Sequence, residues 1–151
     1  MVLRTVILAI LAITLVGWEA VASPASQVAQ QMLLGDNNDK AVMDAEVARQ
    51  MNAARFYKEK GNNPQAINRF KTIIVEYQIS PYVEEALAHI SDAYLALGMK
   101  PEAQCAVAVL QQKFPDSSWS HQALDKLRSA GLEPAEDQKN WIWQAFNGAR
   151  L

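Results

Sequence analysis

The residues that interrupt long runs of helix formers constrain the fold of this chain more than any other feature. Gly61 and Gly98 each stand three residues before a proline, Pro64 and Pro101. A glycine in the left-handed conformation commonly ends a helix, and a proline fits the first turn of the helix that follows. Each pair therefore predicts a tight turn between two helices. The glycines lie 98 minus 61, or 37, residues apart, which indicates a repeated helical hairpin.

Apolar residues occupy matching positions in the two hairpins. Relative to its turn glycine, each unit has such a residue four positions before it and five, nine and twelve positions after it. The predicted core residues are Tyr57, Ala66, Phe70 and Ile73 in the first unit, and Tyr94, Ala103, Val107 and Leu110 in the second. The offset of 37 residues is close to the period of about 34 residues in tetratricopeptide repeats.

The predicted secondary structure of the folded region is helical throughout. The helices that we expect are residues 43–60, 64–77, 81–97, 101–114, 119–129 and 139–149. The fold class is therefore all-α, with tetratricopeptide-like helical hairpin repeats stacked in an α-solenoid and a C-terminal capping helix. An ordinary helical bundle with coincidental spacing is the alternative, because Gln78 stands where the first unit would have a closing proline.

The last predicted helix carries Trp141, Trp143 and Phe146. Residues two positions apart in a helix point about 200° apart, so the two tryptophans cannot both lie on one narrow stripe. One of them should therefore be partly exposed. The helix is interpreted as a cap on the repeat stack, and an anchor to a partner or to a membrane surface is the alternative.

The first 42 residues differ from the rest of the chain. The uncharged run Thr5 to Trp18 has 14 residues, fewer than the roughly 20 that span a bilayer. With the cleavage pattern Ala20-Val21-Ala22, it predicts a signal peptide or an N-terminal anchor over residues 1–22, and hence export. Residues 23–42 are expected to form a polar linker, and residues 43–151 the helical domain.

The segment Leu15-Val16-Gly17-Trp18 is similar to the lipobox of bacterial lipoprotein precursors, with Trp18 at the position of the lipidated cysteine. Attachment of diacylglycerol through a thioether requires a cysteine sulfur, so we expect no lipidation at Trp18. Without a lipid, the exported chain would be periplasmic or retained at the inner membrane.

Composition and residue spacing argue against several classes of function. A formal net charge of -2 and a pI near 5.7 give no excess positive field for a nucleic acid. Cys105 is the single cysteine, and neither His89 nor His121 stands beside a cysteine or a paired carboxylate at ligand spacing. No phosphate-binding glycine loop and no hydrolase motif occurs. We therefore expect a non-enzymatic protein without a catalytic site, metal, cofactor or small-molecule substrate.

Several runs of residues, at turns and on the surface as well as in the core, match one known family. They include Ala54 to Tyr57, Ala66 to Thr72, Pro81 to Leu87, Ala93 to Gly98, Phe114 to Ser117 and Gly131 to Pro134. Over about residues 43–151, the chain resembles the C-terminal half of the BamD family, and its tail is similar to the alphaproteobacterial members. These proteins are tetratricopeptide lipoproteins of the outer-membrane β-barrel assembly machinery.

The resemblance implies a non-enzymatic scaffold subunit at the periplasmic face of the outer membrane. Its partners would be the periplasmic domains of BamA, the central barrel subunit, and other Bam lipoproteins. Arg69 matches the arginine that pairs with an acidic group on BamA in this family. It stands beside the stripe formed by Ala66, Phe70 and Ile73, so its guanidinium is expected to point outward.

The same resemblance predicts a shortened protein, or truncated paralogue, because the N-terminal repeats of the family precede the region matched here. Such a protein would keep the scaffold contact and lose the groove for unfolded barrel substrates. Two alternatives stay open. One is a generic periplasmic tetratricopeptide adaptor for protein–protein interactions, and the other is a degenerate paralogue without a stable partner.

Overall fold

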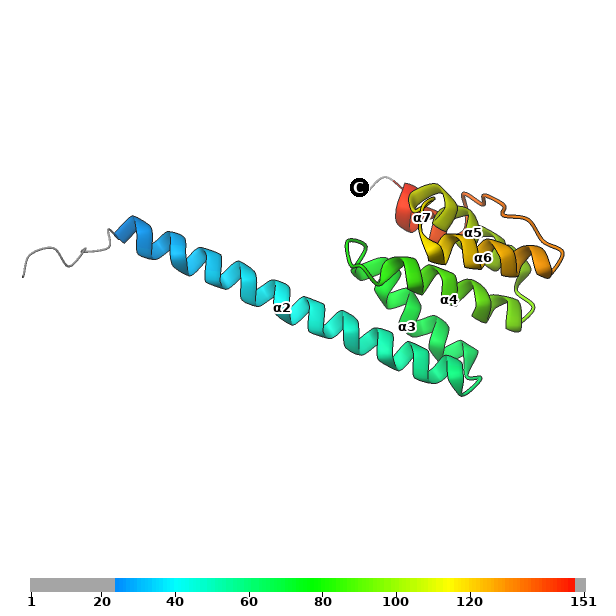
Figure 1. Ribbon diagram of the computed structural model, residues 1–151, viewed down its shortest axis with the longest axis horizontal. Coiled ribbons are helices and arrows are strands. Elements are labelled where there is room, and N and C mark those ends of the chain that lie inside the picture. Colours follow the sequence, from blue (N-terminus) through cyan, green and yellow to red (C-terminus); the bar gives the residue numbers. More distant parts are fainter. Residues whose placement is uncertain (1–23, 149–151) are drawn as a thin grey trace, which may run out of the picture. The chain divides into compact units, whose positions relative to one another are not determined.

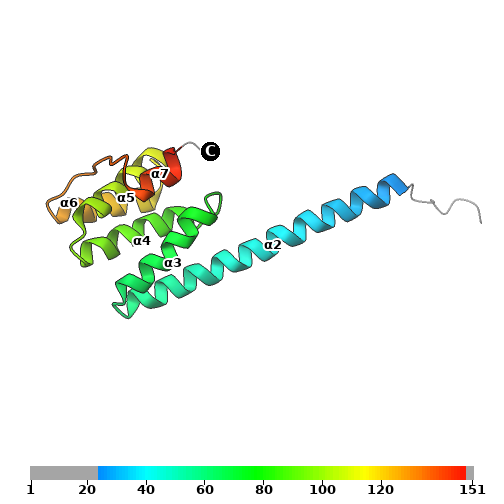
Figure 2. The same cartoon turned by 180° about the vertical axis from the view of Figure 1, so that it is seen from behind.

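The computed structural model describes residues 24–148, and every regular element within that range is a helix (Figure 1). The helices are α2 (Pro24–Glu59), α3 (Asn63–Glu76), α4 (Val83–Ala96), α5 (Lys100–Lys113), α6 (Ser118–Ser129) and α7 (Trp141–Asn147). The predicted all-α fold is therefore confirmed. α4 lies between α3 and the pair α5 and α6, while α7 packs against α5 and α3 (Figure 1, Figure 2).

The chain divides into two compact units, residues 1–40 and 41–151. α2 begins at Pro24, whereas we predicted a polar linker over residues 23–42 and a first helix only from residue 43. That prediction of secondary structure was wrong. Gly35 and the polar residues after it each cost only about 1 kcal/mol or less in a helix, and no proline follows Pro24 within α2.

The predicted signal peptide or anchor, residues 1–22, lies outside the described residues, and so does Trp18. Within the described residues, none of the helices combines the length and the apolar character that crossing a membrane requires. The assignment of the chain to a signal segment, a linker and a helical domain stays a prediction.

The two predicted hairpin turns are closed by the same backbone geometry. Gly61 and Gly98 have φ angles of 71° and 74°, in the left-handed region that glycine enters without a steric penalty from a Cβ. The residue after each glycine donates its N–H to the carbonyl five residues earlier, at 2.9 Å in both turns. These hydrogen bonds satisfy carbonyls that the end of the preceding helix leaves free. The hairpin is therefore repeated, as predicted.

Most of the predicted core residues are buried among α3, α4 and α5. The positions with no exposed area are Ala66, Phe70, Ile73, Ala103, Val107 and Leu110. Tyr94 is 4% exposed, and Tyr57 is half-buried at the edge of the core. The apolar positions of both hairpins thus meet in one core, which their spacing from the turn glycines had predicted.

The short helix α7 covers the end of this core. Ile142 is fully buried, and Trp141 and Trp143 on either side of it are both half-buried. Trp141 Nε1 donates to Tyr94 Oη at 3.2 Å, and the Lys71 ammonium lies 5.0 Å from the centroid of the Trp141 ring. α7 therefore joins α4 and α3 and acts as a cap.

Replacing Ala103 with tryptophan is expected to lower the free energy of unfolding by about 1–3 kcal/mol or more. Ala103 has no exposed area, so the indole can enter only by displacing neighbouring side chains and backbone. Urea denaturation followed by circular dichroism measures the effect. Ala45, which is exposed on α2, is the matched control, and its tryptophan variant should stay within about 0.5 kcal/mol of the wild type. A neutral Ala103→Trp variant would contradict the packing described here.

Candidate protein-binding surface

Arg69 lies on α3, directly before the buried Phe70, and its side chain is half-buried. Its guanidinium does not point straight into solvent, which differs from the orientation expected from the sequence. Arg69 Nη1 donates a hydrogen bond to Gln50 Oε1 on α2 at 3.1 Å. Gln50 is only 7% exposed. The guanidinium is therefore held against α2 by an acceptor that is almost buried.

Gln50 is held in turn by Glu46, one helical turn earlier on α2. Gln50 Nε2 donates to Glu46 Oε1 at 2.6 Å, and Arg49 donates to both carboxylate oxygens of Glu46 at 2.8 and 2.7 Å. Because the amide nitrogen faces the carboxylate, the amide oxygen must face Arg69. We call these four side chains, Arg49, Glu46, Gln50 and Arg69, the α2–α3 relay.

Glu46 stays ionised at neutral pH within this relay. The hydrogen bond from Arg49, followed by the one from Gln50, lowers the pKa of Glu46 to about 2, and the positive charge of Arg69 acts in the same direction. The relay thus contains two guanidinium groups and one carboxylate. Since Arg49 already pairs with Glu46, the excess positive charge resides on Arg69.

Arg69 differs from the other arginines that the structure describes. The ion pairs of these others are Arg49–Glu46, Arg55–Glu85 and Arg128–Glu133. Among residues 24–148, Arg69 is the arginine that has no carboxylate within 4.0 Å of its guanidinium nitrogens. Its only hydrogen bond in that part of the chain, to Gln50, goes to a neutral acceptor. Four of the five N–H donors of the guanidinium are left for another group.

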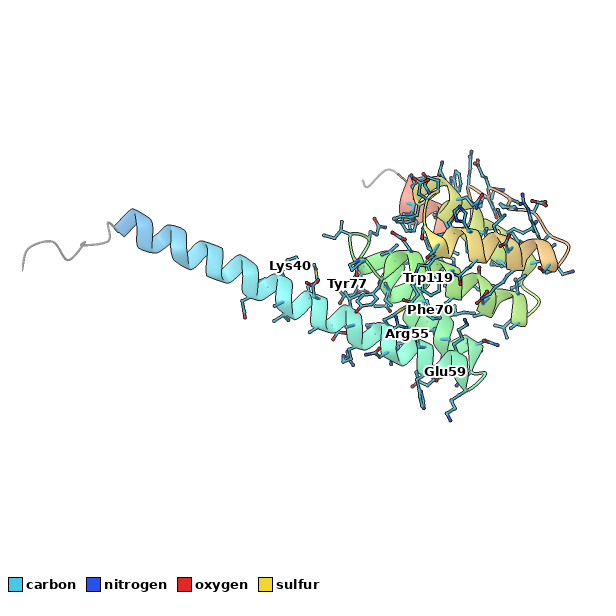
Figure 3. All side chains as sticks on the ribbon, viewed as in Figure 1. Lys40, Arg55, Glu59, Phe70, Tyr77 and Trp119 are labelled. Carbon is cyan, nitrogen blue, oxygen red and sulfur yellow. The ribbon has the colours of Figure 1, made fainter. Side chains whose placement is uncertain are left out.

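A second set of charges joins α2, α4 and α6, and the sequence did not predict it. Lys58 of α2 and Lys126 of α6 both donate to Asp92 Oδ2 on α4, at 2.9 and 2.7 Å. Each lysine stands 34 residues from Asp92 in the sequence. Arg55 of α2 donates to both carboxylate oxygens of Glu85 on α4, at 2.7 and 2.6 Å. Figure 3 labels Arg55 on α2.

His89 lies inside this set of charges and connects it to the apolar core. Its Nδ1 is 2.8 Å from Lys58 Nζ, and because an ammonium can only donate, Nδ1 must accept. The His89 ring also contacts Phe70 and Trp119, with centroid distances of 5.7 and 5.2 Å; Figure 3 labels these two partners. Its ring contacts are those of a packing residue.

The carboxylate of Asp92 is the centre of these contacts. Burial alone raises the pKa of Asp92, but the hydrogen bonds from Lys126 and Lys58 outweigh burial and hold the pKa well below its ordinary value. Asp92 is therefore ionised at neutral pH. Lysines from α2 and α6 converge on its Oδ2, which makes this cluster a structural clamp between helices. The α2–α3 relay is therefore taken as the candidate binding site.

The remaining residues whose side chains could react or bind a metal do not lie together in one site. Cys105 is fully buried, and burial raises the pKa of its thiol, which disfavours the reactive thiolate. His121 is exposed on α6. Within residues 24–148, no three histidines, cysteines or carboxylates are placed to hold a metal ion.

Comparisons with known proteins agree with the resemblance found in the sequence. Residues 40–110, which include Arg69 and the whole relay, match the family model described as YfiO, outer membrane lipoprotein. The outer membrane protein assembly factor BamD of Caulobacter vibrioides is 36% identical over 94 residues, which cover 62% of this chain and 31% of that protein. No solved structure matches the chain significantly.

Two further relatives carry the same name, outer membrane protein assembly factor BamD. The protein of Rickettsia prowazekii is 37% identical over 78 residues, covering 52% of this chain and 31% of its own length. That of Neisseria meningitidis serogroup A is 40% identical over 76 residues, covering 50% of this chain and 28% of its own length. The chain spans about a third of the length of these relatives. The predicted resemblance is confirmed, and the helical unit of this chain is BamD-like.

Proposed function

We propose that this chain is a non-enzymatic scaffold subunit in the assembly and insertion of outer-membrane β-barrel proteins. Its helical unit binds the periplasmic domains of BamA and lies beside other Bam lipoproteins at the periplasmic face of the outer membrane. The names of its relatives support this role, because they are outer membrane protein assembly factors. The stacked helical hairpins support it as well, since repeats of this kind create extended surfaces for proteins.

One observation supports Arg69 as the residue that makes this contact. Of the arginines in the described part of the chain, Arg69 alone has no carboxylate partner, and its guanidinium is already oriented by Gln50. A planar guanidinium with free donors is suited to a carboxylate, which it can bind through two parallel hydrogen bonds. Arg69 is therefore the residue that pairs with an acidic group of BamA.

Replacing Arg69 with glutamate is expected to weaken capture of the BamA periplasmic domains by about 2 kcal/mol, or roughly 30-fold. An attractive pair of charges then becomes a repulsive one inside the interface. The purified chain would be immobilised and its affinity for these domains measured by surface plasmon resonance. Circular dichroism of the variant should match the wild type, because the substitution leaves the buried residues of α3 unchanged.

Arg128 offers the matched control. It is an arginine on α6, 55% exposed and paired with Glu133, so Arg128→Glu should leave the affinity for BamA nearly unchanged. Equal affinities of the wild type and the Arg69→Glu variant would remove Arg69 from the interface. Failure of the wild-type chain to bind BamA at all would favour the generic tetratricopeptide adaptor.

A further inference from the structure

We propose that Gln50 is a positioning residue that presents the guanidinium of Arg69 to an acidic group of the partner. This inference rests on the proposed function, in which Arg69 contacts BamA. Gln50 itself is 7% exposed, so it lies under the surface and acts through Arg69.

The hydrogen bonds of the relay fix the orientation of Gln50. Its Nε2 donates to Glu46 Oε1 at 2.6 Å, and Arg49 donates to both carboxylate oxygens of Glu46. Turning the amide over would bring its oxygen against the carboxylate and its nitrogen against the Arg69 guanidinium, so both contacts would become repulsive. Gln50 Oε1 is therefore a fixed acceptor for Arg69 Nη1, at 3.1 Å.

The neutrality of Gln50 matters as much as its position. A carboxylate at residue 50 would also accept from Arg69, but it would neutralise the guanidinium and compete with the carboxylate of the partner. An amide holds the same edge of the guanidinium and leaves the positive charge in excess. An arginine side chain otherwise loses much rotamer freedom on binding. Gln50 restricts that freedom before the partner arrives.

The test uses two variants of the full chain with different expectations. Gln50→Met keeps the length and burial of the side chain and removes the acceptor, so the affinity for the BamA periplasmic domains should fall about tenfold. Gln50→Glu keeps an acceptor for Arg69 but neutralises the guanidinium and replaces the amide donor beside Glu46 by a second carboxylate, so the affinity should also fall. If Gln50 only filled space, the methionine variant would bind as the wild type does.

A double-mutant cycle separates positioning from a general structural effect. In the Arg69→Ala background, Gln50→Met should cause no further loss of affinity, because nothing remains to be positioned. Additive losses in the double variant would overturn the proposal. Gln122, which is exposed on α6, is the matched control, and Gln122→Met should leave the affinity unchanged.

Nitrogen NMR of the free chain gives a readout that does not depend on BamA. In the wild type, the hydrogen bond should slow rotation of the Arg69 guanidinium and give it resolved Nη signals, which Gln50→Met should average. If those signals do not change, Gln50 does not position Arg69, even where BamA binds. If they change as expected but the wild type does not bind BamA, the proposed function fails, and the role of Gln50 in partner binding fails with it.

Discussion

Phe70→Ala is expected to lower the free energy of unfolding by about 3–5 kcal/mol, the cost typical of a buried aromatic side chain that is cut back to alanine. Phe70 has no exposed area, and its ring packs against His89 of α4. The truncation leaves a cavity between the two hairpins, which close-packed neighbours fill only in part. Because a domain of this size is stable by about 5–15 kcal/mol, the variant should denature at much lower urea, measured by circular dichroism.

Phe56 provides a control of the same residue type. It lies on α2 with 54% of its surface exposed, and Phe56→Ala should change the free energy of unfolding by less than about 1 kcal/mol. If the two alanine variants changed the free energy of unfolding by similar amounts, the region around Phe70 would have to be loosely packed. That result would contradict the buried core of the hairpins.

Asp92→Asn is expected to lower the free energy of unfolding by about 2 kcal/mol at neutral pH. Breaking a buried ion pair costs about 3–5 kcal/mol, and the expected effect is smaller because one of the two lysine partners, Lys126, is 54% exposed. The more buried Lys58, which is 27% exposed, would lose the carboxylate that balances its charge. Urea denaturation of both proteins at pH 7 measures the difference.

The advantage of the wild type over Asp92→Asn should disappear in acid. In the folded protein the pKa of Asp92 lies well below 3.8, the value for the unfolded chain. The ionised carboxylate therefore contributes stability in full above that value, and the contribution is lost as the pH falls below it. Glu133→Gln is the control, because Arg128–Glu133 is an exposed pair and should contribute less than about 1 kcal/mol at any pH. A difference that persists unchanged at low pH would contradict the ionised state of Asp92.

The hairpins could be predicted from the sequence because their signals are local. Gly61 and Gly98 mark the turns through a backbone conformation that other residues rarely adopt. The buried positions of α3 and α5 follow at fixed distances from these glycines. The start of α2 could not be predicted in this way. Glycine, asparagine and aspartate favour turns, yet a helix can continue through them at a modest cost per residue.

The contacts of the candidate site depend on pairs of residues that are far apart in the sequence. Arg69 could be singled out in the sequence because it matches a position of the family. Its partner Gln50 is 19 residues away, and no pattern in the sequence predicts that Gln50 is buried. Glu85 and His89 could be placed on one face of a helix by their spacing of four. The lysines that complete their cluster come from other helices, and only the stacking of those helices shows the contact.

The order of the charges in the clamp restricts which hairpin of the stack can be removed or duplicated. Lys58 of α2, Asp92 of α4 and Lys126 of α6 are 34 residues apart in each step, so the charges that these three helices bring together alternate in sign. Removing the hairpin that carries Asp92 would bring two ammonium groups together, and duplicating it would bring two carboxylates together. Like charges in such a half-buried position repel. Removing or duplicating this hairpin alone should therefore destabilise the stack of helices.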